Sequence, residues 1–457
     1  MNDYTRQVRD GMMSASIGVA LHEEGQYHRR IRQILLTMIA MMLLGALFFT
    51  SDVIATMSGI LVIFVISVIG LRFTLNGLIA LIPWANRPPD LRRTPPIDIV
   101  IPAYFEEMVL EKTVLTALKS DYQGEMNVIL SIEERCTDNT NEIAYDLERQ
   151  FRNVSVVTRN RSGGGKAASA NDGIRFGSAP YICSIDADHL LEPDAISRAV
   201  SHLEAGADCV KGRCRTIRSK TSLIGWLAGL EREMVERMVI PSWYRIGGFA
   251  IFGGGQAFFR RSALESVGLF DETMLTEDVD CSLKFHLSGR RIISDPRIVT
   301  WETQPSKWKD WWNQRIRWSR GWTQAAISHT GPVAESQKVG GWRKFDIMMG
   351  MYATLAVPIF VLMIPLILKT ALDASDWRFD GEPLEWWWLW ISFMPSGLSI
   401  LRILVDAIDD RELPHLRDII GSILLYPYLL VHFLVSWFAF LDETITPAER
   451  TYIKTGR

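Results

Sequence analysis

The chain has 457 residues, of which 48% are hydrophobic and 22% are charged, and its formal net charge is −3. This balance lacks the excess of lysine and arginine that nucleic-acid binding requires, and the apolar content is sufficient for membrane segments. All the cysteines lie in the middle of the chain without a CxxC pair, so we expect reduced thiols in a cytoplasmic domain and no cysteine metal site. They are Cys136, Cys183, Cys209, Cys214 and Cys281.

The N-terminal part of the chain predicts a membrane hairpin. Residues 1–32 are polar and basic, which favours a cytoplasmic arm that is interfacial or loosely ordered. Two apolar runs follow at 33–50 and 53–70, and each approaches the length that crosses a bilayer. Arginines flank the pair on both sides, as the positive-inside rule requires. No small-residue cleavage site is evident, so 33–84 is expected to hold two anchors rather than a signal peptide, with 75–84 at the interface.

From residue 88 to about 335 the composition is that of a soluble domain. Short β-branched runs alternate with stretches of helical periodicity, which predicts an α/β domain with a parallel sheet and right-handed crossovers. In such sheets ligands bind at the carboxyl ends of the strands. Strands are expected at 97–102, 126–132, 154–157 and 181–185, and helices at 108–119, 141–152, 166–175, 222–246 and within 275–289.

Apolar runs return after the soluble domain. They lie at 345–368, 386–404 and 419–441, which predicts two to three transmembrane helices, and a short tail follows at 442–457. With two spans before the domain, three after it would leave the C-terminus on the far side of the membrane. A tail that acts at the domain requires an even number of membrane spans after it. One of the three apolar runs is therefore expected to be re-entrant or interfacial, and the region Trp386–Trp388 is the first candidate.

Two acidic motifs are candidates for chemistry. Asp186 and Asp188 follow a buried strand, and carboxylates two residues apart at a strand end point to the same side, where they can hold Mg²⁺ or Mn²⁺ on a diphosphate. The alternative is a turn pair before the next helix. Glu277 and Asp278 stand beside an apolar stretch and could supply a general base for a sugar hydroxyl. The alternative there is an ordinary helix N-cap.

Two glycine-rich segments suggest close approach of backbone to a ligand. The loop 161–166 places flexible backbone, Arg161 and Lys166 at the start of a helix, which suits a phosphate group. A solvated loop is the alternative. The Gly253–Gly255 run requires a tight turn or a ligand in contact with the backbone.

The stretch 308–322 crowds arginine and tryptophan at helical spacing. Such a helix suits a membrane interface, where indoles sit at the headgroup level and arginine stems snorkel. The same residue types suit sugar-nucleotide chemistry, because arginine pairs with diphosphate oxygens. The residues alone leave both interpretations open.

Seven short motifs occur in one order along residues 97–330. They are Ile101–Glu107, Thr137–Thr140, Gly165–Ala167, Asp186–Asp188, Gly253–Gly255, Thr276–Asp278 and Gln314–Trp318. In this combination the chain resembles the membrane-integrated, inverting family 2 glycosyltransferases, a group that contains cellulose, chitin and hyaluronan synthases. The resemblance implies an α/β, GT-A-like nucleotide-sugar transferase domain inserted between transmembrane helices, with amphipathic interfacial helices.

The resemblance also implies roles for single residues. Asp186 and Asp188 would hold the cation, Mg²⁺ or Mn²⁺, and Asp278, with Glu277 beside it, would supply the general base. The residues implied for the donor nucleotide are Tyr104, Glu106, Glu133, Lys166, Asp186, Arg315 and Arg317. Those implied for the acceptor are Gln314, Trp318, Gly254 and Gly255.

One departure from the family and one further match bear on these roles. At the second strand end the family usually has two aspartates followed by Gly-Ser, and the first aspartate meets the nucleotide base. This chain has Glu133-Glu134-Arg135-Cys136, which changes the depth of the pocket and the contact with the base. The C-terminal Tyr452–Arg457 is similar to a short segment that closes over the nucleotide in some of these synthases; a plain tail is the alternative.

The function implied is an inverting transfer from a nucleoside-diphosphate sugar, UDP-linked in the first instance, to a growing β-linked polysaccharide that is exported across the membrane. Two alternatives are a non-processive transferase that makes a glycolipid, and a catalytically reduced subunit that binds sugar nucleotide, for which only Glu133 argues. In each case we expect an integral protein of the cytoplasmic membrane, with its catalytic domain in the cytoplasm, in contact with lipid and glycan but not with nucleic acid. The sequence identifies no export partner.

Overall fold

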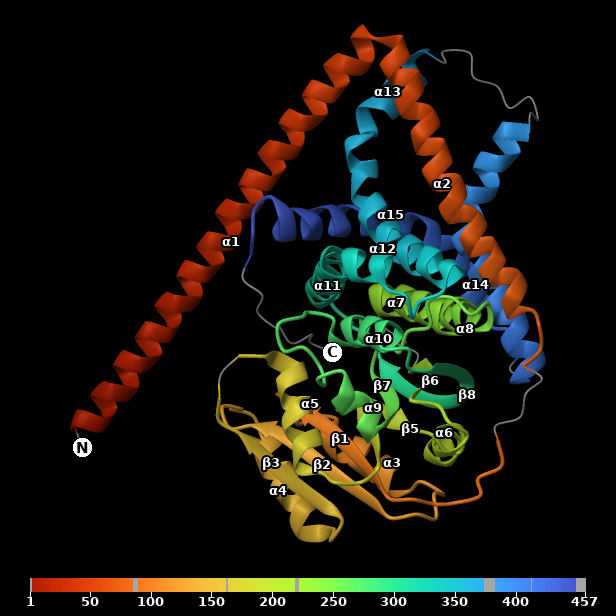
Figure 1. The fold of residues 1–457 in the computed structure, drawn as a ribbon. Helices are drawn as coiled ribbons and strands as arrows, with labels where there is room; N and C mark the ends of the chain where they lie inside the picture. The colour runs from red at the N-terminus through yellow and green to blue at the C-terminus, as the bar shows by residue number, and fades with distance from the viewer. Residues whose placement is uncertain are drawn as a thin grey trace.

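The computed structural model describes residues 2–84, 89–161, 163–217, 222–373, 383–411 and 413–448. It consists of a sheet flanked by helices and of long helices that rise from one side of this sheet domain (Figure 1). The segment Tyr452–Arg457, with its predicted closing role, lies outside the described residues.

The first half of the sheet is parallel, as predicted. Its four strands lie in the order β3-β2-β1-β4 and pair in parallel. They are β1 (Ile97–Ala103), β2 (Met126–Glu133), β3 (Val154–Arg159) and β4 (Tyr181–Ile185), joined through helices α3 (Leu110–Leu118), α4 (Thr140–Gln150) and α5 (Gly165–Phe176). All seven residues of β1 are buried, which is typical of a parallel strand covered by helices on both faces.

The second half of the sheet, where no strands were predicted, is mixed. Strand β7 (Gln256–Arg260) lies antiparallel between β4 and β6, and β5 (Leu190–Leu191) is antiparallel to β8. Strands β6 (Cys209–Ile217) and β8 (Ile292–Thr303) are parallel. The apolar pattern of a strand reports its burial but not its direction, so the sequence could not reveal the reversal. Because β7 is antiparallel, its first residue pairs with the last residue of β4, and the turn before β7 lies beside the end of β4.

Apolar side chains fill both faces of the sheet. Ile99 and Ile101 of β1 belong to one buried cluster, whereas Val100 between them belongs to the cluster on the opposite face with Ile129 and Phe259. This alternation is the two-residue period of a strand. The resulting rigid core presents the strand ends, and the polar residues after them, at one edge.

Several helices lie between the sheet and the long helices. The predicted helix 222–246 is interrupted by a π-helical turn and becomes α7 (Leu223–Met234), the turn η1 (Val235–Val239) and α8 (Ile240–Arg245). The others in this part of the chain are α6 (Ala195–Glu204), α9 (Arg261–Ser266), α10 (Glu277–Leu287) and α11 (Trp308–Glu335). In Figure 1, α7, α10 and α11 form a layer across the top of the sheet domain.

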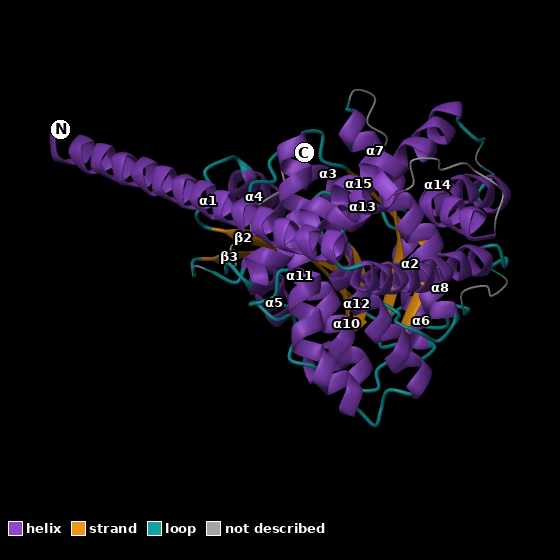
Figure 2. Ribbon diagram, turned by 90° about the horizontal axis from the view of Figure 1, so that it is seen from above, coloured by secondary structure: helices purple, strands orange, loops and turns teal. Residues whose placement is uncertain are grey.

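The N-terminal region is a pair of long helices. Helix α1 runs without a break from Asn2 to Thr50, so the arm predicted at 1–32 is not a separate element; its residues include no proline that would end a helix. Helix α2 (Asp52–Ala80) begins after Ser51, whose hydroxyl caps it, and takes in much of the predicted interfacial segment. Seen from above, the N-terminal part of α1 projects from one side of the molecule (Figure 2).

The C-terminal region contains four helices. The run predicted at 345–368 is divided at Met363 into α12 (Gly341–Leu362) and α13 (Ile364–Asp373), and the later runs lie within α14 (Pro383–Asp409) and α15 (Leu416–Thr444). Among the described residues, three helical segments have the length and composition to cross a membrane: Gly25–Thr50, Asp52–Ala80 and Leu416–Thr444.

Helix α15 follows the helical layer of the domain from one end to the other. Arg417 lies over the Trp226 ring of α7, Tyr428 accepts a hydrogen bond from the Trp311 indole of α11 at 2.7 Å, and Glu443 pairs with Arg320 at 2.5 Å. Figure 1 shows α15 lying across this layer, and its C-terminal part also contacts α1, where Arg30 pairs with Asp442 at 2.9 Å and Trp437 donates to Thr37 at 2.8 Å. Both ends of α15 therefore contact the same domain.

Candidate functional site

A pocket opens at the carboxyl ends of β1, β2 and β4. Seven of the residues singled out from the sequence line it: Tyr104, Glu106, Glu133, Lys166, Asp186, Asp188 and Arg317. Pro102, Ala103, Arg135, Gly165, Ser169 and Ala187 complete the lining. Most of these residues follow a strand or begin α5, so the parallel half of the sheet brings them together as the strand-end rule predicts.

A second pocket adjoins the first and shares two residues with it. Lys166 and Asp186 line both, and Gly254, Gly255, Glu277 and Asp278 line the second. The Lys166 ammonium lies 2.5 Å from Asp186 Oδ1 and 3.1 Å from Glu277 Oε1, and so it stands at the junction. The structure thus places the two acidic motifs on either side of one lysine.

Asp278 is oriented by backbone donors. Its Oδ2 accepts the Gly254 N–H at 2.7 Å, and its Oδ1 accepts the N–H of Val279 at 2.8 Å. Asp278 is in the first turn of α10, where the helix dipole favours a carboxylate. Glu277 is instead paired with Lys166, so of the two acidic candidates Asp278 is the one fixed beside the glycine turn.

Asp186, Asp188 and the next residue, His189, form a possible metal site. One ligand atom from each lies within 4.8 Å of the others. Carboxylate oxygens are the ligands that Mg²⁺ and Mn²⁺ prefer, whereas both ring nitrogens of His189 already contact Asp188, Cys214 and Glu302. The two carboxylates therefore fit a divalent cation at the boundary of the two pockets.

His189 is a site residue that the sequence analysis missed. Its ring is buried, with Nδ1 at 3.1 Å from Asp188 Oδ1 and Nε2 at 3.3 Å from Cys214 Sγ and 3.2 Å from Glu302 Oε2. Burial by itself lowers the pKa of His189, but Cys214 and Glu302 raise it to about 10. Its position directly after the acidic pair was the signal that could have drawn attention to it.

The structure separates the two arginines of Gln314–Trp318. Arg317 lines the first pocket and donates to the Leu275 carbonyl at 3.3 Å. Arg315 is buried on another face of α11, where it donates to Glu231 Oε2 at 2.6 Å and to the Tyr428 hydroxyl at 3.4 Å. Residues two apart on a helix are turned by about 200°, which is why the two side chains diverge.

Gln314 and Trp318 of this motif both contact Arg315. Gln314 accepts a hydrogen bond from Arg315 at 2.7 Å, and the Trp318 ring lies 4.3 Å from the Arg315 guanidinium carbon. Gln314, Arg315 and Trp318 do not line either of the two pockets described above. Of this motif, the structure brings only Arg317 to the candidate site.

We expect Arg315 to stabilise the fold. Arg315→Met would leave Glu231 as a largely buried carboxylate without its guanidinium, and removing one partner of a buried pair costs about 3–5 kcal/mol. Because Glu231 keeps 16% of its side chain exposed, we expect a loss of folding free energy near the lower of these values. It would be measured as a lower thermal unfolding temperature in detergent. The double variant with Glu231→Gln should regain part of the loss; unfolding of Arg315→Met at the wild-type temperature would contradict this role.

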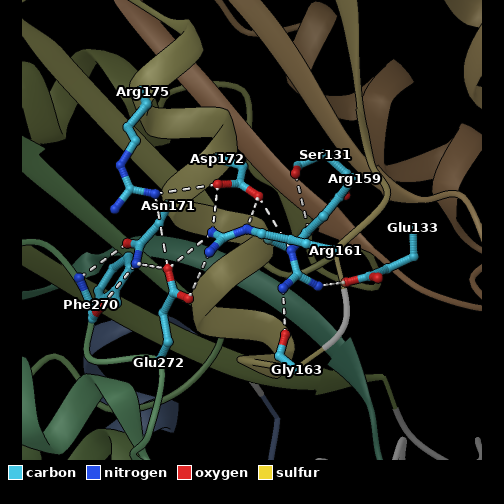
Figure 3. Close-up of polar contacts among 11 residues, drawn as sticks. Ser131, Glu133, Arg159, Arg161, Gly163, Asn171, Asp172, Arg175, Phe270 and Glu272 are labelled. Atoms are coloured by element: carbon cyan, nitrogen blue, oxygen red, sulfur yellow. Dashed lines mark hydrogen bonds and ion pairs between the residues drawn. The ribbon is translucent and has the colours of Figure 1, made fainter.

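The glycine-rich loop is held by a network of ion pairs (Figure 3). Its three glycines, Gly163 to Gly165, all have positive φ, between 52° and 84°. Arg161 pairs with Asp172 at 2.8 Å and with Glu272 at 3.2 Å. Of the two cations predicted to meet phosphate, Arg161 is therefore engaged in holding the loop and Lys166 alone reaches the pockets.

Glu133 is anchored from the neighbouring strand. Glu133 and Arg159 are register partners on β2 and β3, and Arg159 Nη1 donates to Glu133 Oε1 at 2.6 Å (Figure 3). The other oxygen, Oε2, has no hydrogen-bond partner among the described residues, although Arg135 Nε lies 3.4 Å away. Arg135 also lies over the Tyr104 ring at 5.3 Å, so it belongs to this corner of the pocket and was not predicted.

Comparisons with known proteins agree with this geometry. Residues 95–321 match the family model described as "Glycosyltransferase like family 2". The chain is 28% identical over 239 residues to the probable glycosyltransferase YdaM of Bacillus subtilis, covering 51% of this chain and 56% of that protein, or little more than half its length. It is 26% identical over 344 residues to the poly-beta-1,6-N-acetyl-D-glucosamine synthase of Staphylococcus epidermidis, covering 74% and 81%.

A solved structure has a similar fold. It is the mannosyltransferase PcManGT from Pyrobaculum calidifontis in complex with GDP-Man and Mn²⁺, with a TM-score of 0.59 and 18% identity. The match covers 86% of this chain and 99% of that one, so the likeness extends from the sheet domain into the flanking helices.

Proposed function

Because residues 95–321 match the glycosyltransferase family 2 domain, we propose that the chain transfers a sugar, with inversion, from a UDP-linked donor to a growing β-linked polysaccharide. UDP-N-acetylglucosamine is the donor favoured by the match to the S. epidermidis synthase. The observation that supports this proposal is the pair of adjoining pockets, which join the strand-end residues to Asp278 through Lys166 and Asp186.

The donor nucleotide would lie in the first pocket. Glu133 in the lining would lie beside the base, while Arg159 and Arg135 keep its carboxylate in place. Tyr104, with Arg135 over its ring, offers an aromatic edge to the base and ribose. Lys166 and Arg317, in the same lining, would meet the diphosphate, because cationic side chains pair strongly with phosphate oxygens.

The acidic pair would hold a divalent cation on that diphosphate. Asp186 and Asp188, with His189 behind them, fit Mg²⁺ or Mn²⁺, and Mn²⁺ accompanies GDP-Man in the Pyrobaculum structure. A bound cation would neutralise charge on the departing diphosphate. Activity titrated with each metal would distinguish between them.

The second pocket would receive the acceptor. Asp278 would take the proton from the attacking hydroxyl as that oxygen bonds to the anomeric carbon, and the bond from this carbon to the diphosphate breaks on the opposite side. Lys166 and Arg317 lie where charge then accumulates. Gly254 and Gly255 border this pocket, consistent with their predicted place on the acceptor side, whereas the acceptor role of Trp318 and Gln314 stays a prediction.

A panel of donors tests the proposal. Purified full-length chain in detergent would be incubated with UDP-N-acetylglucosamine, UDP-glucose and GDP-mannose, and nucleotide release and product size would be measured. Release of UDP with a polymer ladder is the expected result. One small glycolipid product would favour the non-processive alternative, and no release with any donor would favour a binding subunit.

We also propose that α15 lies along the membrane face of the domain and does not cross the bilayer. Its two ends contact one domain, and Arg320, which precedes the glycine that packs against Thr276, donates to the carbonyl of Ala448. The crossings after the domain would then be α12–α13 outward and α14 inward, which keeps the C-terminus with the catalytic domain. The interfacial segment would be α15 and not the predicted Trp386–Trp388 region.

Cysteine labelling checks this topology. In a chain freed of its five cysteines, Leu413→Cys and Ile445→Cys would flank α15, and Val53→Cys would mark the α1–α2 hairpin; all three positions are exposed. With a membrane-impermeant maleimide on intact cells, only position 53 should react, and the other two should react after permeabilisation. Labelling of positions 413 and 445 from opposite sides would contradict the proposal.

A further inference from the structure

The turn Gly253–Gly255 holds both acidic motifs through its backbone. The Gly254 N–H donates to Asp278 Oδ2 at 2.7 Å, and the Gly255 carbonyl accepts the Asp186 N–H at 2.9 Å. Gly254 and Gly255 have φ of +81° and +58°, which glycine adopts without strain. A shift of this turn would therefore change the distance between the base and the metal-binding pair.

The side chains of Arg232 and His189 lie in close contact with the backbone of the turn. A Cβ on Gly254 would lie 2.2 Å from Nη2 of Arg232, and a Cβ on Gly255 would lie 1.8 Å from Nε2 of His189. Neither contact leaves room for a side chain. The glycines are thus required by the close approach of Arg232 and His189 as well as by their φ angles.

One carboxylate ties the two basic groups together. Glu302 Oε1 accepts from Arg232 Nε at 2.8 Å, and Glu302 Oε2 lies 3.2 Å from His189 Nε2. The side chain of Glu302 is 9% exposed and that of Arg232 is 11% exposed. Ion pairs so shielded from water act at a low dielectric, so they hold these three side chains in one arrangement.

Arg232 connects the group of Arg232, Glu302 and His189 to helices that pack outside the sheet domain. It belongs to α7, where the preceding Glu231 pairs with Arg315 of α11 and the following Glu233 pairs with Arg402 of α14, both within 2.7 Å. The position of Arg232 over the turn is therefore set by helices that pack outside the sheet domain.

We propose that Arg232, Glu302 and His189 form a clamp that positions Asp278 relative to Asp186 and Asp188, with Arg232 as a positioning residue for sugar transfer. This inference rests on the proposed function, which supplies the roles of these aspartates. Reacting groups displaced by about 1 Å can lose about a hundredfold in rate. A loosened clamp should therefore lower kcat and leave the donor pocket, which none of the three residues lines, unchanged.

The test compares three variants of the full-length chain. Arg232→Lys keeps the charge but cannot cover Gly254 and bind Glu302 together, and Glu302→Gln removes the carboxylate with little change in shape. Arg237→Lys is the matched control, since Arg237 is 7% exposed, lies one turn further along and pairs with Asp406 and Asp409 of α14 and not with the turn. The measurements are kcat and KM for UDP-N-acetylglucosamine, and binding of UDP with Mn²⁺ by calorimetry.

We expect Arg232→Lys and Glu302→Gln to lower kcat about tenfold or more, with KM and UDP–Mn²⁺ affinity within about twofold of wild type, and Arg237→Lys to retain its kcat. Wild-type kcat in either clamp variant, an equal loss in Arg237→Lys, or a parallel loss of UDP–Mn²⁺ binding would overturn the clamp. A wild-type chain that releases no nucleotide from any donor would instead overturn the proposed function.

Discussion

Asp278→Asn is expected to lower the rate of sugar transfer by about a hundredfold or more, because the amide cannot take the proton of the attacking hydroxyl. Asparagine keeps an oxygen for the Gly254 N–H, so the turn and the pockets should be preserved. UDP release by the purified variant measures the rate, and UDP–Mn²⁺ binding should stay at the wild-type level.

Asp271→Asn is the control for this change. Asp271 precedes the same motif, accepts hydrogen bonds from Thr273 and lines neither pocket. The Asp271→Asn variant should transfer sugar at a rate near that of the wild type. Turnover of Asp278→Asn near the wild-type rate would show that another group accepts the proton.

Arg317→Ala is expected to lower the transfer rate by about a hundredfold and to weaken UDP–Mn²⁺ binding, since it removes a cation from the pocket proposed to hold the diphosphate. Arg315→Ala is the matched comparison, two residues away on the same helix. It should reduce thermal stability yet leave the UDP–Mn²⁺ affinity of the folded protein unchanged, because Arg315 faces Glu231 and Tyr428.

The roles assigned to Arg315 and Arg317 would be wrong if Arg315→Ala weakened UDP–Mn²⁺ binding and Arg317→Ala lowered only the thermal stability. Equal weakening of UDP–Mn²⁺ binding in both would show that Arg315 moves to the donor during binding.

Much of the site could be predicted because its residues follow strands. The β-branched runs marked the ends of β1, β2 and β4, and parallel strands bring such ends to one edge. Asp186 and Asp188 meet in one pocket with Tyr104 and Lys166, which the family resemblance singled out. Strand β7 was not predicted, and an apolar pattern would not have shown its direction, so the contact of Gly254 with Asp278 could not be foreseen.

The features outside the sheet that the sequence did not reveal have a common cause, which is pairing between distant segments. Arg232 was not singled out from the sequence, because its partner Glu302 is 70 residues away on β8. Arg315 was grouped with Arg317 as one motif, although Glu231 and Tyr428 draw it to another face. Hydropathy marks α15 as a candidate span, and the contacts with Trp226 and Arg320, on which the proposal that it lies along the domain rests, are visible only in the structure.

The central claim is that the two adjoining pockets join a donor site to Asp278 for an inverting transfer. It is tested most directly by incubating the purified chain with labelled UDP-N-acetylglucosamine and Mn²⁺, counting UDP released against sugar incorporated, and determining the anomeric configuration of the product by NMR. We predict one UDP for each sugar incorporated and a β-linkage formed from the α-linked donor. An α-linked product, or UDP released without incorporated sugar, would contradict it.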